Sequence, residues 1–221
     1  MLPVPLDLKW LGHAGFLIKV GMKNIYIDPY QISSGEKKAD ILLITHSHYD
    51  HCSIEDINKI IKKDTLVLCP ADCQSKITKL DVKMQVVEPG QKLRIDNITI
   101  KAVPAYNINK KFHSKGENWL GYIIENGKTV YHAGDTDLIP EMKKIAELAK
   151  KKRLIALLPV GGTYTMDSAE AARAAQIIKP FLAIPMHWGS IIGSKEDAEK
   201  FVELCKEKGI SAKILEKESK I

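Results

Sequence analysis

Three imidazoles and one carboxylate stand within six residues of this chain, in His46-Ser47-His48-Tyr49-Asp50-His51. Such side chains are costly to bury unless each finds a partner, so packing alone does not account for them. Alternation along an extended segment places His46 and His48 on one side, and the following turn presents Asp50 and His51 to a neighbouring point. This is the layout of two adjacent metal sites, and its mixture of nitrogen and oxygen ligands suits Zn²⁺, Fe or Mn²⁺.

Two further polar residues follow apolar segments in the same way. Asp135 comes after the predicted strand 129–132 through Ala133-Gly134, where glycine allows a sharp turn of the backbone. A carboxylate at such a place can bridge two metal ions about 3.5–4 Å apart. His187 comes directly after the predicted strand 182–185. We therefore expect one rim of the sheets to collect the site.

The elements that must position these residues are short strands and amphipathic helices. Asn126-Gly127 is typical of a hairpin turn, and Asp167 with Glu170 predicts a capping box at a helix start. The stretch 104–118 is polar and without period, which predicts a surface loop that carries function. Strands are expected at 7–11, 16–20, 24–27, 41–44, 65–69, 82–87, 93–95, 98–103, 119–125, 129–132, 155–159, 182–185 and 211–215, and helices at 54–63 (with Ser53 as N-cap), 71–79, 139–152, 168–179 and 195–208. This order predicts an α+β fold, a four-layer sandwich in one domain over residues 1–221 with two sheets inside and helices outside.

Composition narrows the class of protein. The chain has 221 residues, of which 45% are hydrophobic and 27% charged, as is usual for a soluble globular protein. Its net charge of +6 favours a phosphate-bearing substrate or serves solubility. No apolar stretch is long enough to span a bilayer, and residues 1–5 lack the pattern of a signal peptide. We therefore expect a cytoplasmic protein, and in that compartment its cysteines should be reduced. Cys52, next to the histidine cluster, is the one thiol that could approach a metal there.

The sequence resembles the metallo-β-lactamase superfamily over nearly its whole length, from about residue 8 to residue 214. The H-x-H-x-D-H pattern at 46–51, Ala-Gly-Asp-Thr at 133–136 and the late His187 occur in the order of that family. The segments 10–14, 158–162 and 185–189 are similar to one branch, which includes the ascorbate-6-phosphate lactonases and the N-acyl phosphatidylethanolamine phospholipase D enzymes.

The resemblance implies the metallo-β-lactamase fold, with its αβ/βα layers, and a site for two divalent metal ions. Zn²⁺ is favoured, with Mn²⁺ and Fe as alternatives. Metal 1 would be bound by His46 and His48, and metal 2 by Asp50, His51 and His187, with Asp135 bridging the two. Asp28, in Ile27-Asp28-Pro29, matches a family aspartate that supports the ligand loop through hydrogen bonds.

One departure from the family pattern concerns the third histidine of metal 1. In this branch that histidine follows a Pro-Ala-aromatic sequence, but here Pro104-Ala105-Tyr106 leads to Asn107. An amide oxygen is a poor zinc ligand beside imidazole. His113, six residues further on, either takes that place or is an exposed loop residue.

Two histidines are interpreted by their position. His13 lies at a Gly-His-Ala turn that in similar proteins is close to the metals, so it is a candidate for supporting catalysis or contacting substrate. His132, inside a predicted strand, is expected to be a core histidine with its hydrogen bonds satisfied.

The predicted site implies a metal-dependent hydrolase. A hydroxide bridging two cations would attack an ester, lactone or phosphodiester bond of a small, optionally phosphorylated substrate, with Asp50 orienting the nucleophile and accepting its proton. The alternative is a metal-binding protein that has lost catalysis and acts as a binding or regulatory module. No nucleic-acid or membrane partner is expected, because no basic patch with aromatic residues and no membrane-binding helix is visible, while a homo-oligomer remains compatible with the branch.

Overall fold

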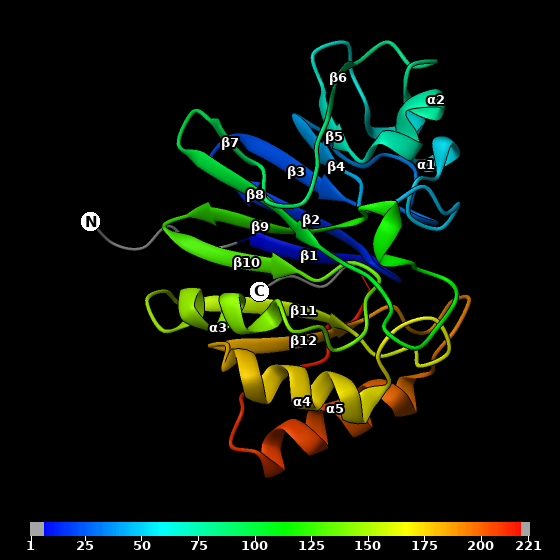
Figure 1. Ribbon diagram of the computed structural model, residues 1–221. Coiled ribbons are helices and arrows are strands. Elements are labelled where there is room, and N and C mark those ends of the chain that lie inside the picture. Colours follow the sequence, from blue (N-terminus) through cyan, green and yellow to red (C-terminus); the bar gives the residue numbers. More distant parts are fainter. Residues whose placement is uncertain (1–6, 218–221) are drawn as a thin grey trace. The chain divides into compact units, whose positions relative to one another are not determined.

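The computed structural model describes residues 7–217, so the stretch 1–5, judged not to be a signal peptide, lies outside the described residues (Figure 1). The chain divides into two compact units, which we describe separately. The first unit ends at Glu88 and takes in Glu216 and Lys217, and the second unit runs from Pro89 to Leu215. That the chain forms a single domain stays a prediction.

The first unit contains a mixed six-stranded sheet with the strands in sequence order, β1 to β6. The first three strands pair antiparallel and the next three pair parallel to their neighbours. The strands are β1 (Asp7–Gly12), β2 (Gly15–Val20), β3 (Lys23–Ile27), β4 (Ile41–Leu43), β5 (Leu66–Cys69) and β6 (Lys83–Val86), and the helices are α1 (Ile54–Ile60) and α2 (Gln74–Ile77). All three residues of β4 are buried, as expected of a parallel strand covered on both faces.

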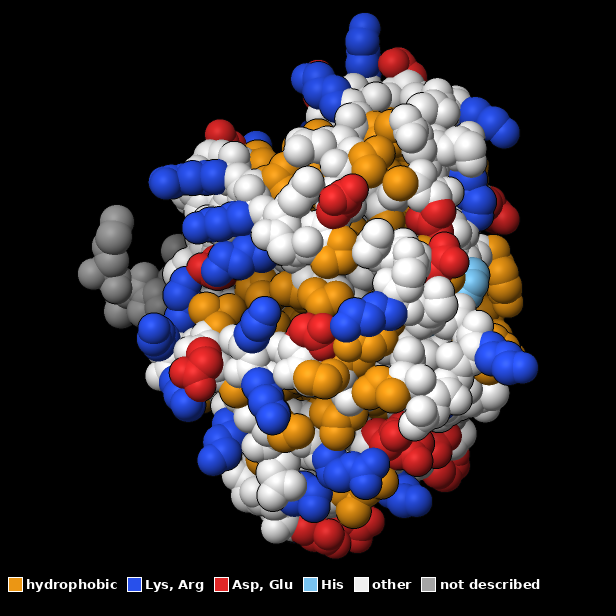
Figure 2. Space-filling model, viewed as in Figure 1, with side chains coloured by type: hydrophobic (Ala, Val, Ile, Leu, Met, Phe, Trp, Pro, Cys, Tyr) orange, Lys and Arg blue, Asp and Glu red, His pale blue; other side chains and the backbone are white. Residues whose placement is uncertain are grey.

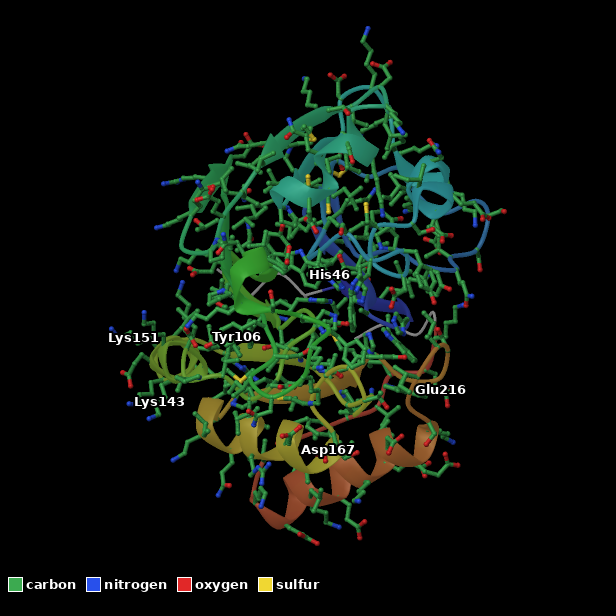
Figure 3. All side chains as sticks on the ribbon, turned by 45° about the vertical axis from the view of Figure 1, so that its right-hand side comes forward. His46, Tyr106, Lys143, Lys151, Asp167 and Glu216 are labelled. Atoms are coloured by element: carbon green, nitrogen blue, oxygen red, sulfur yellow. The ribbon has the colours of Figure 1, made fainter. Side chains whose placement is uncertain are left out.

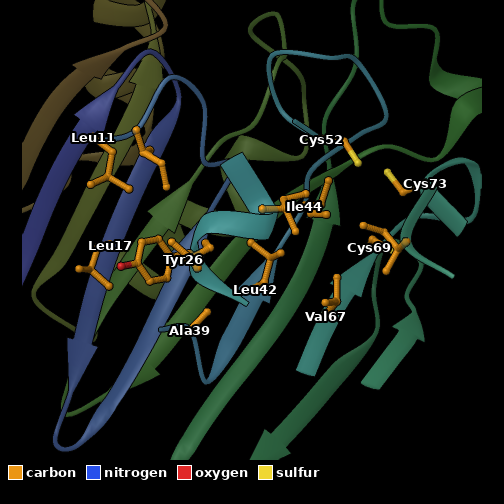
Figure 4. Close-up of a cluster of buried hydrophobic side chains, with 14 residues drawn as sticks. Leu11, Leu17, Tyr26, Ala39, Leu42, Ile44, Cys52, Val67, Cys69 and Cys73 are labelled. Carbon is orange, nitrogen blue, oxygen red and sulfur yellow. The ribbon is translucent and has the colours of Figure 1, made fainter. Parts of the chain in front are cut away.

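An apolar cluster joins the sheet of the first unit to its helices (Figure 4). Tyr26 and Leu42 belong to it from the strands, and Ile57 and Ile60 from α1. Ser53 caps α1 as predicted, since its side chain accepts a hydrogen bond from the backbone N–H of Asp56. This packing holds the start of α1 against β4, and the loop between them carries the histidine cluster.

The second unit contains another mixed six-stranded sheet, in the order β12-β11-β10-β9-β8-β7. Strands β7 to β10 pair antiparallel, and β10, β11 and β12 pair parallel. The strands are β7 (Lys92–Ile95), β8 (Ile98–Pro104), β9 (Leu120–Asn126), β10 (Lys128–His132), β11 (Leu154–Pro159) and β12 (Leu182–Met186), and the helices are α3 (Met142–Ala149), α4 (Ser168–Ile178) and α5 (Lys195–Glu207). Helices α4 and α5 lie side by side along β11 and β12 (Figure 1).

Local signals in the second unit are largely confirmed. The hairpin turns at Asn126 and Gly127, and Asp167 at the start of α4 forms the predicted capping box with Glu170 (Figure 3). Two mixed sheets with flanking helices confirm the α+β fold class.

Several expected elements differ from the structure. The helix expected at 54–63 ends at Ile60, and the helix expected at 71–79 is a 3₁₀ turn (Ala71–Cys73) followed by α2. The strand predicted at 211–215 is wrong, because only Ala212 forms a bridge, to Ala183 of β12. Helix α3 begins three residues later than expected, since Pro140 disfavours helical backbone at the residue before it. The loop 104–118 is not wholly a surface loop: Asn107 and His113 are both buried.

The surface charges are of both signs, and the cysteines are not joined in disulfides. Figure 2 shows lysine and arginine side chains interspersed with acidic ones over the face in view, without one large basic patch. All four cysteines are free and buried. None of the helices within residues 7–217 has the length and apolar character needed to cross a membrane.

Candidate metal centre

Asp28 organises the loop that follows β4. Its carboxylate, at the end of β3, accepts hydrogen bonds from the Thr45 backbone N–H at 2.9 Å and from the Thr45 hydroxyl at 2.6 Å. It also lies 2.8 Å from Nδ1 of His51. A carboxylate can only accept here, so Nδ1 of His51 carries a proton, and in the neutral ring the lone pair is then on Nε2. The expected supporting role of Asp28 thus has a definite geometry.

His46 and His48 lie together on this loop, with Nε2 of His46 3.0 Å from Nδ1 of His48 (Figure 3 labels His46). Two nitrogens bound to one tetrahedral zinc are about 3.3 Å apart. The two imidazoles therefore lie next to each other, although the backbone bends at Ser47 and His48, and their separation is one that a single metal ion can use.

Asp50 lies at the centre of a second group in the first unit. Its Oδ2 is 2.9 Å from Nε2 of His13 and 3.4 Å from Nε2 of His51. His13 reaches this position from the β1–β2 turn, where its φ is +51°, and its carbonyl accepts a hydrogen bond from the Trp10 indole. Each of His13, Asp50 and His51 offers a ligand atom within 4.8 Å of the others.

Asp135 is the corresponding centre in the second unit. Its Oδ2 lies 3.0 Å from Nε2 of His187 and 3.3 Å from Nε2 of His113. Gly134 makes the turn after β10 possible: its φ is +66°, and a Cβ there would lie 2.4 Å from the carbonyl oxygen of Leu120. The second unit thus brings together three candidate ligands that the sequence places far apart.

Asn107 holds His113 in this arrangement. The Asn107 side-chain oxygen accepts from the His113 backbone N–H and lies 3.0 Å from His113 Nδ1. Nδ1 is also 3.1 Å from the carbonyl oxygen of Tyr164, an acceptor only, so Nδ1 carries the proton. His113 is therefore not an exposed loop residue. It is 1% exposed and directs Nε2 towards Asp135.

Asp137 was missed by sequence reasoning, although it supports the same loop. It accepts hydrogen bonds from the Asn107 amide at 3.1 Å, the Ile108 backbone N–H at 2.9 Å and the Lys110 ammonium at 2.5 Å. The only signal available in the sequence was its position two residues after Asp135, on the same side of an extended segment.

His132, Cys52 and two tryptophans near these groups make structural contacts. His132 is a core histidine as predicted, and its Nδ1 accepts a hydrogen bond from Gly134. The Trp119 ring lies 5.3 Å from that of His113, and the Trp188 indole donates to the backbone at Pro185. Cys52 packs in the apolar cluster of the first unit, where the hydrogen bond from Cys73 holds the pKa of its thiol below the ordinary value.

The donor atoms fit a divalent metal. In His51 and in His113 the acceptors around Nδ1 place a proton there, so the neutral ring turns an Nε2 lone pair towards a carboxylate oxygen, at 3.4 Å and 3.3 Å respectively. Such a pair repels unless a cation lies between the two atoms, and a nitrogen and an oxygen on one tetrahedral zinc are about 3.4 Å apart. Imidazole with carboxylate is also the ligand set that Zn²⁺, Mn²⁺ and Fe accept.

Two mixed sheets with outer helices, and loops that place histidines against carboxylates after the strands, define a metal-binding α+β protein. The family model for the beta-lactamase superfamily domain matches residues 7–187. A UPF0173 metal-dependent hydrolase of Thermoplasma acidophilum is 35% identical over 90% of this chain and 91% of its own, and one of Archaeoglobus fulgidus is 32% identical over 95% of each chain. The chain belongs to the metallo-β-lactamase superfamily and, within it, to the UPF0173 metal-dependent hydrolase family.

Solved structures agree with the fold. A crystal structure from Parabacteroides distasonis is 32% identical with a TM-score of 0.82, covering 95% of this chain and 92% of that one. The metallo hydrolase Igni18 of Ignicoccus hospitalis is 26% identical with a TM-score of 0.80, covering 98% and 97%. The metallo-β-lactamase fold expected from the sequence is thereby confirmed.

Proposed function

We propose that this protein is a hydrolase that uses two divalent metal ions, Zn²⁺ in the first place, to cleave an ester, lactone or phosphodiester bond of a small molecule. The proposed ligands are His46, His48, Asp50 and His51 from the first unit and His113, Asp135 and His187 from the second. One observation carries the proposal: in each unit an imidazole whose Nδ1 faces a hydrogen-bond acceptor turns its Nε2 towards a carboxylate oxygen.

The bound metal would supply a Lewis acid and lower the pKa of water towards neutrality. The chain's own residues prepare the site for this chemistry. Asp28 and Asn107 fix the tautomers of His51 and His113 through hydrogen bonds to Nδ1, which leaves both Nε2 atoms available as ligands. These two histidines then need no change of tautomer when a metal binds.

Asp50 is the proposed proton acceptor. Its Oδ2 is fixed by His13 at 2.9 Å, which keeps the carboxylate in one orientation. His13 is almost fully buried, so this contact is shielded from water. We assign His13 the role of positioning Asp50, and through it the attacking water.

Two features bear on the class of bond that is cleaved. The resemblance to the lactonase and phospholipase D branch and the excess of six positive charges favour a lactone or a phosphoester. The relatives are named for hydrolysis and for metal dependence, which supports the reaction type but not the substrate.

The test is metal content and turnover of Asp135→Asn, measured on protein purified without chelator. We expect two metal equivalents per chain in the parent protein, a loss of metal in the variant, and turnover of aryl ester, lactone and phosphodiester probes reduced at least about 100-fold, the upper end of the effect of a supporting residue. Asp167→Asn is the matched control, since asparagine still caps α4.

Retention of both metals and of the parent rate in Asp135→Asn would contradict the proposed site. Two metals with no turnover of any probe, by contrast, would favour the binding or regulatory module over the hydrolase.

A further inference from the structure

Large apolar side chains are exposed on the loops that carry the proposed ligands. Seven such side chains are exposed among residues 7–217, and four of them lie on three of these loops. Tyr49 stands between His48 and Asp50 and is 62% exposed, the highest value of the four. The other three are Ile108 and Phe112, on the loop that ends at His113, and Ile191, four residues after His187.

The loop 107–113 holds Phe112 in its exposed position. The Asn107 backbone N–H donates to the His113 carbonyl at 2.6 Å, and Lys110 reaches both Asp137 and the Thr165 carbonyl. With both ends of the loop anchored, the Phe112 ring rests against Tyr164, at 4.6 Å between centroids and an interplanar angle of 85°. This edge-to-face pair is a rigid apolar surface next to a proposed ligand.

The first unit has a similar arrangement. The Tyr49 ring lies 6.0 Å from that of Tyr30, and the Tyr30 ring lies 5.7 Å from that of His13. A row of aromatic rings therefore leads from the buried contact between His13 and Asp50 to an exposed tyrosine.

The ammonium group of Lys110, on the loop 107–113, is already paired with two carboxylates. The Lys110 ammonium is 2.5 Å from Asp137 and 3.7 Å from Glu170, so it is poorly placed to bind a substrate phosphate. The exposed ring of Phe181, by comparison, has a partner within the protein, because the guanidinium of Arg153 lies 3.8 Å from its centroid.

We propose that the substrate carries an apolar aryl or acyl group beside the bond to be cleaved, and that Phe112, with Tyr164, contacts this group. Tyr49 provides a second contact of the same kind. The inference rests on the proposed function, because it assigns the substrate class of that site. It favours an apolar ester or lactone over a small phosphorylated sugar.

The experiment measures binding, so that it does not depend on turnover. Zinc-loaded protein is titrated calorimetrically with phenylphosphonate and with methylphosphonate, two anions of equal charge that differ in the apolar group. We expect the phenyl compound to bind at least about tenfold more tightly, the effect of removing one ring face from water. Phe112→Ala should reduce this preference about tenfold, and Phe112→Leu should retain most of it.

Phe181→Ala is the matched control, because Phe181 is 52% exposed against 48% for Phe112 but lies on no ligand loop. It should leave the preference unchanged. Tyr49→Ala tests the first unit independently and should lower the preference even if Phe112→Ala folds poorly.

The outcomes separate the two proposals. Equal binding of both phosphonates to the parent protein, or a preference for methylphosphonate, would overturn the apolar substrate while leaving the metal site intact. An unchanged preference in both Phe112→Ala and Tyr49→Ala would overturn the assigned contacts. If neither phosphonate binds and zinc is not retained, the metal site itself fails and the inference fails with it.

Discussion

Asn107 occupies the place where the family pattern has a metal-binding histidine, and it contributes through hydrogen bonds instead. Its oxygen receives the backbone N–H and Nδ1 of His113, while its amide nitrogen donates to Asp137 and to the Tyr164 carbonyl. The amide therefore uses its donors and its acceptor at once, and its orientation is determined. His113, the imidazole that we propose in place of that histidine, stands six residues further along the loop.

This division of roles makes different predictions for the two residues. His113→Ala should retain about one metal equivalent in place of two, because a proposed ligand is removed. Asn107→Ala should still bind two at saturating zinc but with affinity reduced about 10- to 100-fold, as is usual for a residue that orients a ligand. Elemental analysis and competition with a chromophoric chelator measure the two effects.

Asn126→Ala is the control, since its amide serves only the exposed hairpin next to Asn97. Two tightly bound metals in His113→Ala would show that His113 is not a ligand, and the shift along the loop would have to be abandoned.

At the scale of elements, capped helix starts fix the ends of loops, and two of these loops, before α1 and α5, carry proposed ligands. Helices α1, α4 and α5 each begin at a residue whose side chain accepts a hydrogen bond from the first turn: Ser53, Asp167 and Ser194. In α1 the cap is joined to the loop after β3, because Asp56 accepts hydrogen bonds from the backbone N–H groups of Gln31 and Ile32. Helix α1 and the segment that begins at Asp28 are thus fixed together.

Asp56 should make the stability of the protein sensitive to acid. Burial alone would raise the pKa of this carboxyl, but hydrogen bonds from Lys59, Ser53 and two backbone N–H groups outweigh it and hold the pKa below its ordinary value of 3.8. The folded form therefore binds this proton less readily than the unfolded form. Its contribution is complete above pH 3.8 and is lost as the pH falls from there through the lower, folded-state pKa.

Asp56→Asn should accordingly lower the free energy of unfolding by about 2 kcal/mol at neutral pH and make the acid limb of the stability profile shallower. Urea unfolding at a series of pH values measures both. Asp64→Asn is the control, because Asp64 pairs with Lys83 at an exposed position and should change little. An acid limb of unaltered slope in Asp56→Asn would mean that another carboxyl dominates it.

At the scale of the whole molecule, the proposed ligands span residues 46 to 187 and come from both compact units. An unfolded chain does not hold such a set together, so metal should bind the native state almost exclusively. Binding of this kind raises the free energy of unfolding by about 2.7 kcal/mol when the free metal is 100 times its dissociation constant.

Chelation followed by dialysis should therefore lower the thermal midpoint, and zinc should restore it where magnesium does not. Calorimetry of the parent protein and of Asp135→Asn measures this, and the variant should show a smaller metal-dependent shift. An identical midpoint with and without metal would mean that the ligands contribute nothing to native-state binding under these conditions.

Several features were accessible from the sequence because they depend on neighbouring residues. The buried strand β4 and the histidine cluster behind it, the hairpin at Asn126 and Gly127, and the capping box at Asp167 each arise within a few residues. The strand expected at 211–215 was wrong for the opposite reason. Its apolar pattern suits a strand, but beyond the single bridge at Ala212 it does not pair with β12.

The sequence by itself determined the fold class and the superfamily, and it indicated which imidazoles and carboxylates to propose as metal ligands, whereas the lactonase and phospholipase D branch that it suggested is not confirmed by the relatives. The tertiary structure decided how these side chains are oriented. It showed that His113 is buried against Asp135. It also showed that Asp28 and Asn107 accept hydrogen bonds from Nδ1 of His51 and of His113, and that Asp137 anchors the loop 107–113. The physical reason is that ligand types and strand periods are local properties of a chain, whereas a hydrogen bond between residues 30 positions apart exists only after the strands that carry them have paired.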